Sequence, residues 1–434
     1  MSKSDSRNFT NFVEEKIIPV AAKLGANRGL VAIRDGITLA MPLIIVGSVF
    51  LIISSFPITA WTNWLTKTGL TTLLSHGSNL SFGIMGLIAV YGIAHSFAQS
   101  YGVEGKGAGV VALSSFLIAT PTITTGGKNI LTGIDLQYMG SKGLFVAIVL
   151  GLTSAWVYQW FVNHHITIKL PDTVPPAVGD SFVALIPGAV ILAFWLIIFG
   201  VLSHFNLNIH DILLDVLSKP LGLLGDTLGG TLIAILLNSA FWFVGIHGGN
   251  VVNTILSPIW LMNTDANRLA FQAGKTLPNI ITQPFIDNFV YMGGSGATIG
   301  LVIVIMLLSF KKNTSTMTKT MAPITFVPGL FNINEPTMFG LPVVLNISLI
   351  VPFILAPMCN AIITYTGMSL GIVHNTIGIT IPWTMPPLIS GFLATGGHIS
   401  GSIVQLICIL VDCILYYPFY KIVEKENKDG IESI

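Results

Sequence analysis

Charge is scarce in this 434-residue sequence, in which only 9% of the residues are Asp, Glu, Lys or Arg and 52% are hydrophobic. Soluble globular domains carry about 25% charged residues. The deficit therefore excludes an ordinary soluble domain and predicts an integral membrane protein. The net charge is only +1, so the sequence gives no reason to expect a nucleic-acid partner.

Residues for metal, redox or nucleotide chemistry are also few. The three cysteines, Cys359, Cys408 and Cys413, lack metal or redox spacing. Cys408 and Cys413 fall in an apolar run, and we interpret them as buried small hydrophobic residues. The Gly-Gly-Ser-Gly run at 293–296 lacks the strand, the Lys and the spacing of a phosphate-binding P-loop. No nucleophilic triad or metal cluster is recognisable. The sequence thus predicts a binding site with no metal, no cofactor and no obvious catalyst.

Long apolar runs take the place of the missing charge. They differ from the ~10-residue alternating segments of a porin-type barrel, and 44 Gly and 22 Pro interrupt them, as in transporters. We therefore predict an all-α polytopic membrane protein with about ten transmembrane helices and two re-entrant hairpins. The tenth helix is expected within 366–395 and the hairpins within 248–294 and 323–340. The other nine runs are 36–56, 81–100, 105–121, 143–163, 181–204, 227–246, 295–310, 341–365 and 397–420.

Basic residues predict the side of the membrane on which each end of the chain lies. The first 28 residues are polar and rich in Lys and Arg, and they lack the pattern of a cleavable signal peptide. The positive-inside rule places both this segment and the Lys-containing tail in the cytoplasm. The predicted parts are a cytoplasmic amphipathic segment (1–28), an N-terminal transmembrane half (29–205), a C-terminal transmembrane half (206–420) and a cytoplasmic tail (421–434).

The segment from Met321 to Tyr420 contains no Lys or Arg and only two acids, Glu335 and Asp412. An unpaired acid at the centre of a membrane helix costs roughly a few kcal/mol, so it must face protein, water or a ligand. We expect Asp412 to pair with polar groups. Glu335 lies between an asparagine and a proline, and broken backbone at membrane depth is tolerated where it lines a cavity. This turn therefore predicts a site for a polar, hydroxylated solute.

A structural interpretation of the same turn stays open. Glu335 would then pair with a histidine or accept backbone N–H groups, while Asn332 and Asn334 would cap the turn around Pro336. We favour substrate contact because the acid is isolated and the surrounding backbone is irregular.

Two further segments are candidates for ligand contact. Trp242 to Asn250 ends an apolar run in a glycine-rich break around His247, whose ring can donate, accept and change protonation. The alternative is a histidine that bonds a free carbonyl at a helix end. Trp383 lies among prolines, and a flat indole suits the apolar C–H faces of a sugar. The alternative there is a tryptophan of the membrane interface.

Five segments occur in a distinctive order along the chain. They are Ile33-Arg34-Asp35-Gly36 with Met41-Pro42-Leu43, Phe243-Val244-Gly245-Ile246-His247-Gly248, Gly293-Gly294-Ser295-Gly296-Ala297-Thr298, Asn334-Glu335-Pro336, and Pro382-Trp383-Thr384-Met385-Pro386-Pro387. Together they resemble the EIIC membrane subunit of bacterial sugar phosphotransferase systems, in the lactose, cellobiose and diacetylchitobiose family. The resemblance spans nearly the whole chain.

The resemblance implies ten spans, two re-entrant hairpins and a homodimer built mainly by the N-terminal half. It also implies that the C-terminal half binds a β-linked disaccharide. His247 and Glu335 would contact the sugar, and Trp383 would pack on it. The neighbouring candidates for substrate binding are Trp242, Asn250, Asn332 and Asn334.

The function implied is that of a permease subunit in the bacterial cell membrane, embedded in lipid. It would import the disaccharide for phosphorylation by a cytosolic EIIB partner, which EIIA supplies with phosphate. The chain would not be catalytic alone, although Glu335 could act as a general base if it reaches the attacked hydroxyl. The alternative function is a proton-coupled secondary sugar transporter in which Glu335 and His247 carry the proton. A third class is an intramembrane enzyme such as a glycosyltransferase.

Overall fold

The computed structural model describes Glu15 and residues 18–125, 131–168, 170–171, 175–341, 343 and 346–432. The chain forms two compact units. Unit 1 consists of residues 1–25, 51–72 and 222–434, and unit 2 of residues 26–50 and 73–221. The amphipathic segment expected over 1–28 lies largely outside the described residues, and its described end contains helix α2 (Ile18–Gly25).

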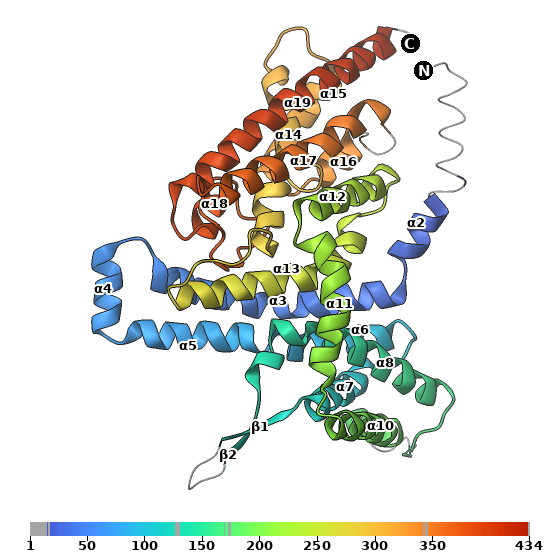
Figure 1. The fold of residues 1–434 in the computed structure, drawn as a ribbon. Helices are drawn as coiled ribbons and strands as arrows, with labels where there is room; N and C mark the ends of the chain where they lie inside the picture. The colour runs from blue at the N-terminus through green and yellow to red at the C-terminus, as the bar shows by residue number, and fades with distance from the viewer. Residues whose placement is uncertain are drawn as a thin grey trace. The chain divides into compact units, whose positions relative to one another are not determined.

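Unit 2 is built around four helices that pack against one another: α6 (Met85–Gln99), α7 (Gly105–Ala119), α8 (Leu144–Asn163) and α10 (Leu185–His204). Figure 1 shows them with a short antiparallel hairpin that the sequence analysis does not predict. The remaining elements are α9 (Pro176–Val183), β1 (Thr122–Thr125), β2 (Leu131–Ile134), the 3-10 turns η2 (Leu136–Tyr138) and η3 (Ser141–Gly143), and most of α3 (Arg28–Ser55), α5 (Leu70–Gly83) and α11 (Ile209–Gly225).

Glycine allows the helices of unit 2 to approach closely. A Cβ at Gly36 of α3 would collide with the side chain and the backbone nitrogen of Ile93 in α6. A Cβ at Gly92 would lie 2.8 Å from the Cα of Gly36, and one at Gly151 of α8 would lie 2.9 Å from Cγ2 of Ile93. Such packing of small residues is a common way for membrane helices to associate.

Unit 1 is organised around the long helix α19 (Ile399–Glu432), which packs against α14 (Ile299–Ser309), α17 (Ile347–Ser369) and α18 (Ile389–Ala394). Its helices vary widely in length, from six residues in α16 and α18 to 34 residues in α19. The other elements are α4 (Thr59–Lys67), α12 (Leu228–Phe243), α13 (Gly249–Gln272), the π-helix η4 (Phe285–Val290), α15 (Thr316–Leu330) and α16 (Glu335–Gly340).

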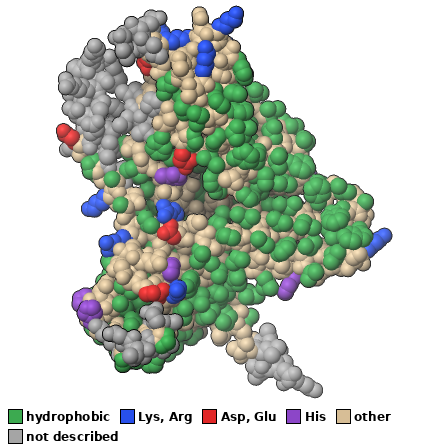
Figure 2. All heavy atoms as spheres, turned by 180° about the vertical axis from the view of Figure 1, so that it is seen from behind, with side chains coloured by type: hydrophobic (Ala, Val, Ile, Leu, Met, Phe, Trp, Pro, Cys, Tyr) green, Lys and Arg blue, Asp and Glu red, His purple; other side chains and the backbone are tan. Residues whose placement is uncertain are grey.

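The predicted all-α polytopic membrane fold is confirmed. Within the described residues, six helical segments are long and apolar enough to cross a membrane, and α11 with α12 adds a seventh if this bent pair counts as one span. Hydrophobic side chains cover much of the face in Figure 2, where charged groups are sparse. The number of ten spans stays a prediction. The six segments are Arg28–Ser55, Leu70–Gln99, Ser141–Asn163, Leu185–His204, Ser348–Ser369 and Ile399–Lys428.

The structure corrects one expected element. No spanning helix lies within 366–395, since residues 370–388 are irregular and α18 is only six residues long. Three prolines in this segment, Pro382, Pro386 and Pro387, oppose helix formation because they remove backbone donors. The tenth helix expected there is therefore wrong.

The two interrupted stretches have different structures. The stretch 248–294 begins with a continuous 24-residue helix, α13, which contains Pro258 and is held by buried side chains such as Trp260. The stretch 323–340 has the helix–turn–helix form of a hairpin, with α15 and α16 in contact across a break at residues 331–334. Whether either stretch is re-entrant stays a prediction.

Candidate functional site

Glu335 is the first residue of α16, immediately after a turn in which Asn332 adopts a left-handed conformation with φ of 62°. Its side chain is exposed. Within the described residues its carboxylate has no hydrogen bond or ion pair. Both carboxylate oxygens can therefore accept hydrogen bonds from a ligand, as the sequence analysis expects of a substrate-binding acid.

Asn332 fastens three segments together. Its Nδ2 donates to the carbonyl oxygens of Trp383 at 2.6 Å and Met385 at 3.0 Å, and its Oδ1 accepts the backbone N–H of Gly293 at 2.6 Å. The residue is only 5% exposed. These bonds use both amide N–H groups and one oxygen lone pair, so the geometry favours a positioning role for Asn332 rather than sugar contact.

The glycine turn at 293–296 packs directly against the Glu335 turn. Gly293, Gly294 and Gly296 have φ of 82°, 93° and 82°, a region that glycine adopts without steric cost. A Cβ at Gly294 would lie 2.8 Å from Cγ of Asn334. Asn334 Nδ2 donates to the Ser295 carbonyl oxygen at 2.9 Å, so this amide also joins the two turns.

Asn238 of α12 connects the same turns to the break that contains His247. Its Nδ2 donates to Ser295 Oγ at 3.4 Å. A Cβ at Gly248 would collide with the carbonyl oxygen of Asn238, so the break folds directly onto α12. The connection between His247 and the Glu335 turn thus runs through Asn238, Ser295 and Asn334.

His247 is exposed and lies beside Trp242, with ring centroids 4.6 Å apart. Its Nδ1 accepts the backbone N–H of Asn250 at 3.3 Å, so a neutral ring carries its proton on Nε2. Trp242 is only 2% exposed, which favours support of the His247 ring over direct sugar contact. Asn250 is half-buried, and its side-chain amide has no partner within the described residues.

Trp383 is 53% exposed, while its backbone is held by the bond from Asn332. The indole therefore has a large accessible apolar surface on a fixed segment. The structure brings the Asn332, Asn334, Gly293–Ser295 and Trp383 segments into direct contact. Substrate contact by any of the candidate residues stays a prediction.

Sequence reasoning missed Asn238 and the linking role of Ser295. Asn238 is the only side-chain amide in helix α12, and this isolation was the available signal. The sequence around Ser295 contains no signal for this role, because its glycine-rich run does not show what the serine contacts. Among the described residues, no group of three or more His, Cys, Asp or Glu side chains is arranged to hold a metal ion.

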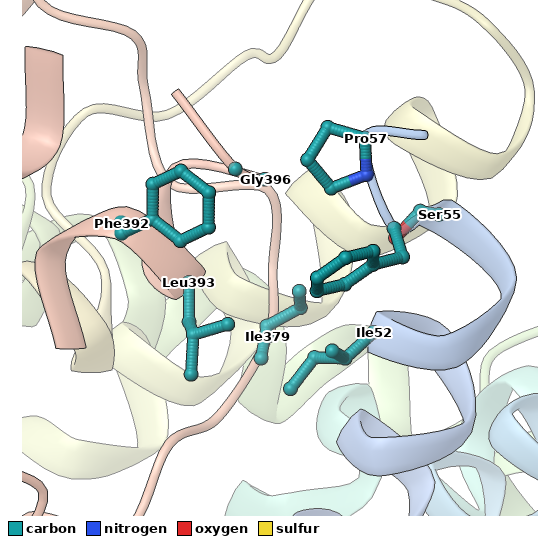
Figure 3. A pocket seen from close by; sticks show the side chains of 9 residues that line it. Ile52, Ser55, Pro57, Ile379, Phe392, Leu393 and Gly396 are labelled. Atoms are coloured by element: carbon teal, nitrogen blue, oxygen red, sulfur yellow. The ribbon is translucent and has the colours of Figure 1, made fainter. Parts of the chain in front are cut away.

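A separate pocket in unit 1 has a different character (Figure 3). Ser55 is the only one of its lining residues whose side chain can hydrogen-bond. A disaccharide needs many polar partners, so this pocket is not the sugar site. The lining residues are Ile52, Ser55, Phe56, Pro57, Ile379, Phe392, Leu393, Gly396 and Gly397.

The chain is similar to known proteins over nearly all of its length. Residues 34–357 match the family described as "Phosphotransferase system, EIIC". The chain is 42% identical to a cellobiose-specific EIIC component of Geobacillus stearothermophilus, over 96% of this chain and 95% of that protein. It is 31% identical to a lactose-specific EIICB component of Lacticaseibacillus casei, over 98% of this chain and 74% of that protein.

A solved structure is also similar. The crystal structure of the transporter ChbC, the IIC component of an N,N'-diacetylchitobiose-specific phosphotransferase system, matches with a TM-score of 0.90. The two chains are 40% identical, and the match covers 97% of this chain and 99% of the other.

Proposed function

This chain belongs to the EIIC family of the phosphotransferase system, and from that premise we propose that it imports a β-linked disaccharide for phosphorylation by EIIB. Relatives named for cellobiose and lactose, and a similar structure named for diacetylchitobiose, support this class of substrate. A glycosyltransferase has no comparable support.

The observation that carries the proposal is the exposed, unpartnered carboxylate of Glu335 on a firmly held turn. Sugar hydroxyls donate hydrogen bonds, and bonds to an ionised acceptor are roughly twice as strong as neutral ones. The apolar indole of Trp383 would cover a C–H face of the sugar. His247 and Asn250 would add polar contacts, while Asn332 and Asn334 hold the turns in place.

Phosphoryl transfer then requires little further chemistry from this chain. The sugar hydroxyl oxygen forms a bond to phosphorus as the S–P bond of the EIIB phosphocysteine breaks, and Glu335 accepts the hydroxyl proton. Phosphoryl transfer depends mainly on positioning and electrostatic stabilisation. A general base must be within hydrogen-bond reach of that hydroxyl, which the exposed position of Glu335 permits.

The assembly is proposed on the same basis. EIIB would dock from the cytoplasm, where both termini of this chain would also lie. The EIICB name of the lactose-specific relative is consistent with close cooperation of the two components. A homodimer formed through the N-terminal half, which the family resemblance implies, completes the proposed assembly.

Uptake by membrane vesicles tests the proposal against proton-coupled transport. The vesicles contain this chain, together with EIIB, EIIA and the soluble proteins that pass phosphate from phosphoenolpyruvate. We expect labelled cellobiose, diacetylchitobiose or lactose to accumulate as its phosphate, only when phosphoenolpyruvate is supplied. Accumulation of free disaccharide that a protonophore abolishes would instead establish the secondary transporter.

A further inference from the structure

Asp412 is a second acid in unit 1, and the proposed sugar chemistry does not use it. It lies in the apolar helix α19 and is 0% exposed. Its Oδ2 accepts a hydrogen bond from Nδ2 of Asn360 in α17, at 3.0 Å, and Asn360 is also 0% exposed. The same Nδ2 lies 3.4 Å from the carbonyl oxygen of Val290, the last residue of η4.

Two oxygens of this pair lack a donor. Asp412 Oδ1 and Asn360 Oδ1 are both buried, and neither accepts a hydrogen bond. The ion pairs of the described residues join Arg34 with Asp35, Arg268 with Asp265 and Lys428 with Glu424, so no cationic side chain neutralises Asp412. An ionised carboxylate would therefore be buried with one neutral amide as its only partner, which is unfavourable.

The surrounding groups supply no positive charge either. The neighbouring titratable side chains are Cys359 of α17 and Cys408, Cys413 and Tyr416 of α19. The helices α14 and α18, which also pack on α19, contain no titratable residue. The only charged residue of η4 is Asp287, whose carboxylate is bound by Gln283.

The space beside Asp412 is closely filled. A Cβ at Gly300 of α14 would lie 2.5 Å from the Cβ of Asp412. A proton is the smallest ligand that satisfies the two bare oxygens. A proton on Asp412 Oδ1 would turn this oxygen into a donor, and the bare Asn360 Oδ1 is an acceptor on the amide that already donates to Asp412 Oδ2. The acid and the amide would then be paired in both directions.

We propose that Asp412 permanently binds one proton and forms a reciprocal acid–amide pair with Asn360, which fastens α19 to α17 and to η4. The proton is a structural ligand and does not travel with the sugar. The fastening matters for the site because Tyr416, one turn further along α19, donates to the carbonyl oxygen of Gly296 at 2.7 Å. The Asp412 pair therefore supports the glycine turn against which Asn334 packs.

Infrared difference spectroscopy on the purified full-length protein tests the proposal directly. The wild-type spectrum at neutral pH should contain the carbonyl stretch of a protonated carboxyl group that the Asp412→Asn spectrum lacks. Asparagine at 412 offers an N–H in place of the O–H. We therefore expect Asp412→Asn to show no loss of folded protein, no shift in thermal midpoint and no loss of uptake.

Two further variants complete the test. The exchange of Asn360→Asp with Asp412→Asn keeps one acid and one amide, so it should preserve folding and uptake. Asp412→Ala leaves Asn360 unpaired and should lower the thermal midpoint and the yield of folded protein. The proposal is overturned if no carboxyl band separates wild type from Asp412→Asn. It is overturned equally if Asp412→Asn fails to fold, or if the wild-type protein requires sodium to fold. Either result would indicate that Asp412 is ionised.

Discussion

The two units bury different kinds of polar group. The side chains buried in unit 2 include Ser, Thr, Gln and a single His, and its helices meet through glycine. In the described part of the chain, all six buried asparagines belong to unit 1: Asn238, Asn267, Asn288, Asn332, Asn334 and Asn360. Hydroxyls can bond within their own helix, whereas an amide can join segments far apart in the sequence. Close helix packing through glycine thus characterises unit 2, whereas buried amides in unit 1 connect its turns and helices.

Left-handed residues other than glycine occur in both units, but in different places. His165 and Asn206 of unit 2 follow the ends of α8 and α10. Ala297, Asn332 and Leu388 of unit 1 lie near the candidate sugar site or the Trp383 segment. Strained conformations persist where the surrounding structure determines them strongly. The difference teaches that a membrane protein can present irregular backbone to a ligand when buried amides replace the missing helical hydrogen bonds.

The largest effect is expected from Asn332→Gly, because glycine keeps the left-handed backbone but removes three hydrogen bonds between segments. Each buried group left without a partner costs about 1–3 kcal/mol. Thermal unfolding in detergent should show a large loss of stability, accompanied by loss of sugar binding. The matched control is Asn163→Gly in unit 2, whose exposed amide bonds only Gln159 at 3.0 Å and should matter little.

A destabilising substitution in unit 2 should affect folding but not the affinity for sugar. Gly36→Ala places a Cβ against the side chain and backbone nitrogen of Ile93, and overpacking of this kind costs about 1–3 kcal/mol. We expect less folded protein, while the folded fraction binds sugar with unchanged affinity. Gly200→Ala in α10, where a Cβ meets nothing within 4 Å, is the control. A weaker affinity in folded Gly36→Ala would show that recognition is not confined to unit 1.

A smaller effect is expected at Trp383, whose exposed indole contributes apolar contact rather than fold stability. Trp383→Ala should weaken disaccharide affinity by about tenfold, corresponding to ~1.4 kcal/mol. Trp383→Phe should be milder because it keeps a flat apolar ring. Equilibrium binding and thermal unfolding should be measured on both variants. Wild-type affinity in Trp383→Ala would assign the residue to the membrane interface instead.

The smallest effect is expected from replacing Cys359, Cys408 and Cys413 together with Ala. Cys408 is buried and its replacement leaves a small cavity, with a cost of about 1 kcal/mol. Phosphoenolpyruvate-dependent uptake should be retained because the phosphorylated cysteine is expected on EIIB. Mass spectrometry of the reconstituted wild-type system provides the check, since phosphate on any of the three would contradict this division of labour.

Features of unit 1 that depend on neighbouring residues in the sequence could be predicted. The isolation of Glu335 in a segment without Lys or Arg, and the proline next to it, indicated an irregular turn, and the structure contains one. Apolar runs located most of the membrane helices within a few residues. The expected helix in 366–395 was wrong because hydrophobicity was given more weight than its prolines.

The roles of the asparagines could not be predicted because they depend on contacts between distant segments. Asn332 bonds residues about 40 and 50 positions away, and Asn238 bonds Ser295, 57 positions away. An asparagine that caps a turn and an asparagine that hydrogen-bonds to distant segments can have the same local sequence. Only the fold shows that Asn332 is fully engaged, whereas Glu335 beside it is not.

Sugar binding to the Glu335→Gln variant shows whether this carboxylate contacts the substrate. The substitution removes the charge but keeps the shape of an exposed side chain that makes no hydrogen bond or ion pair within the described residues, so the protein should remain folded with an unchanged thermal midpoint. Equilibrium binding of labelled cellobiose, diacetylchitobiose and lactose should be compared with wild type. We predict saturable binding of at least one disaccharide to wild type and a loss of about tenfold or more in the variant. Equal affinity in the two proteins would remove Glu335 from the sugar site.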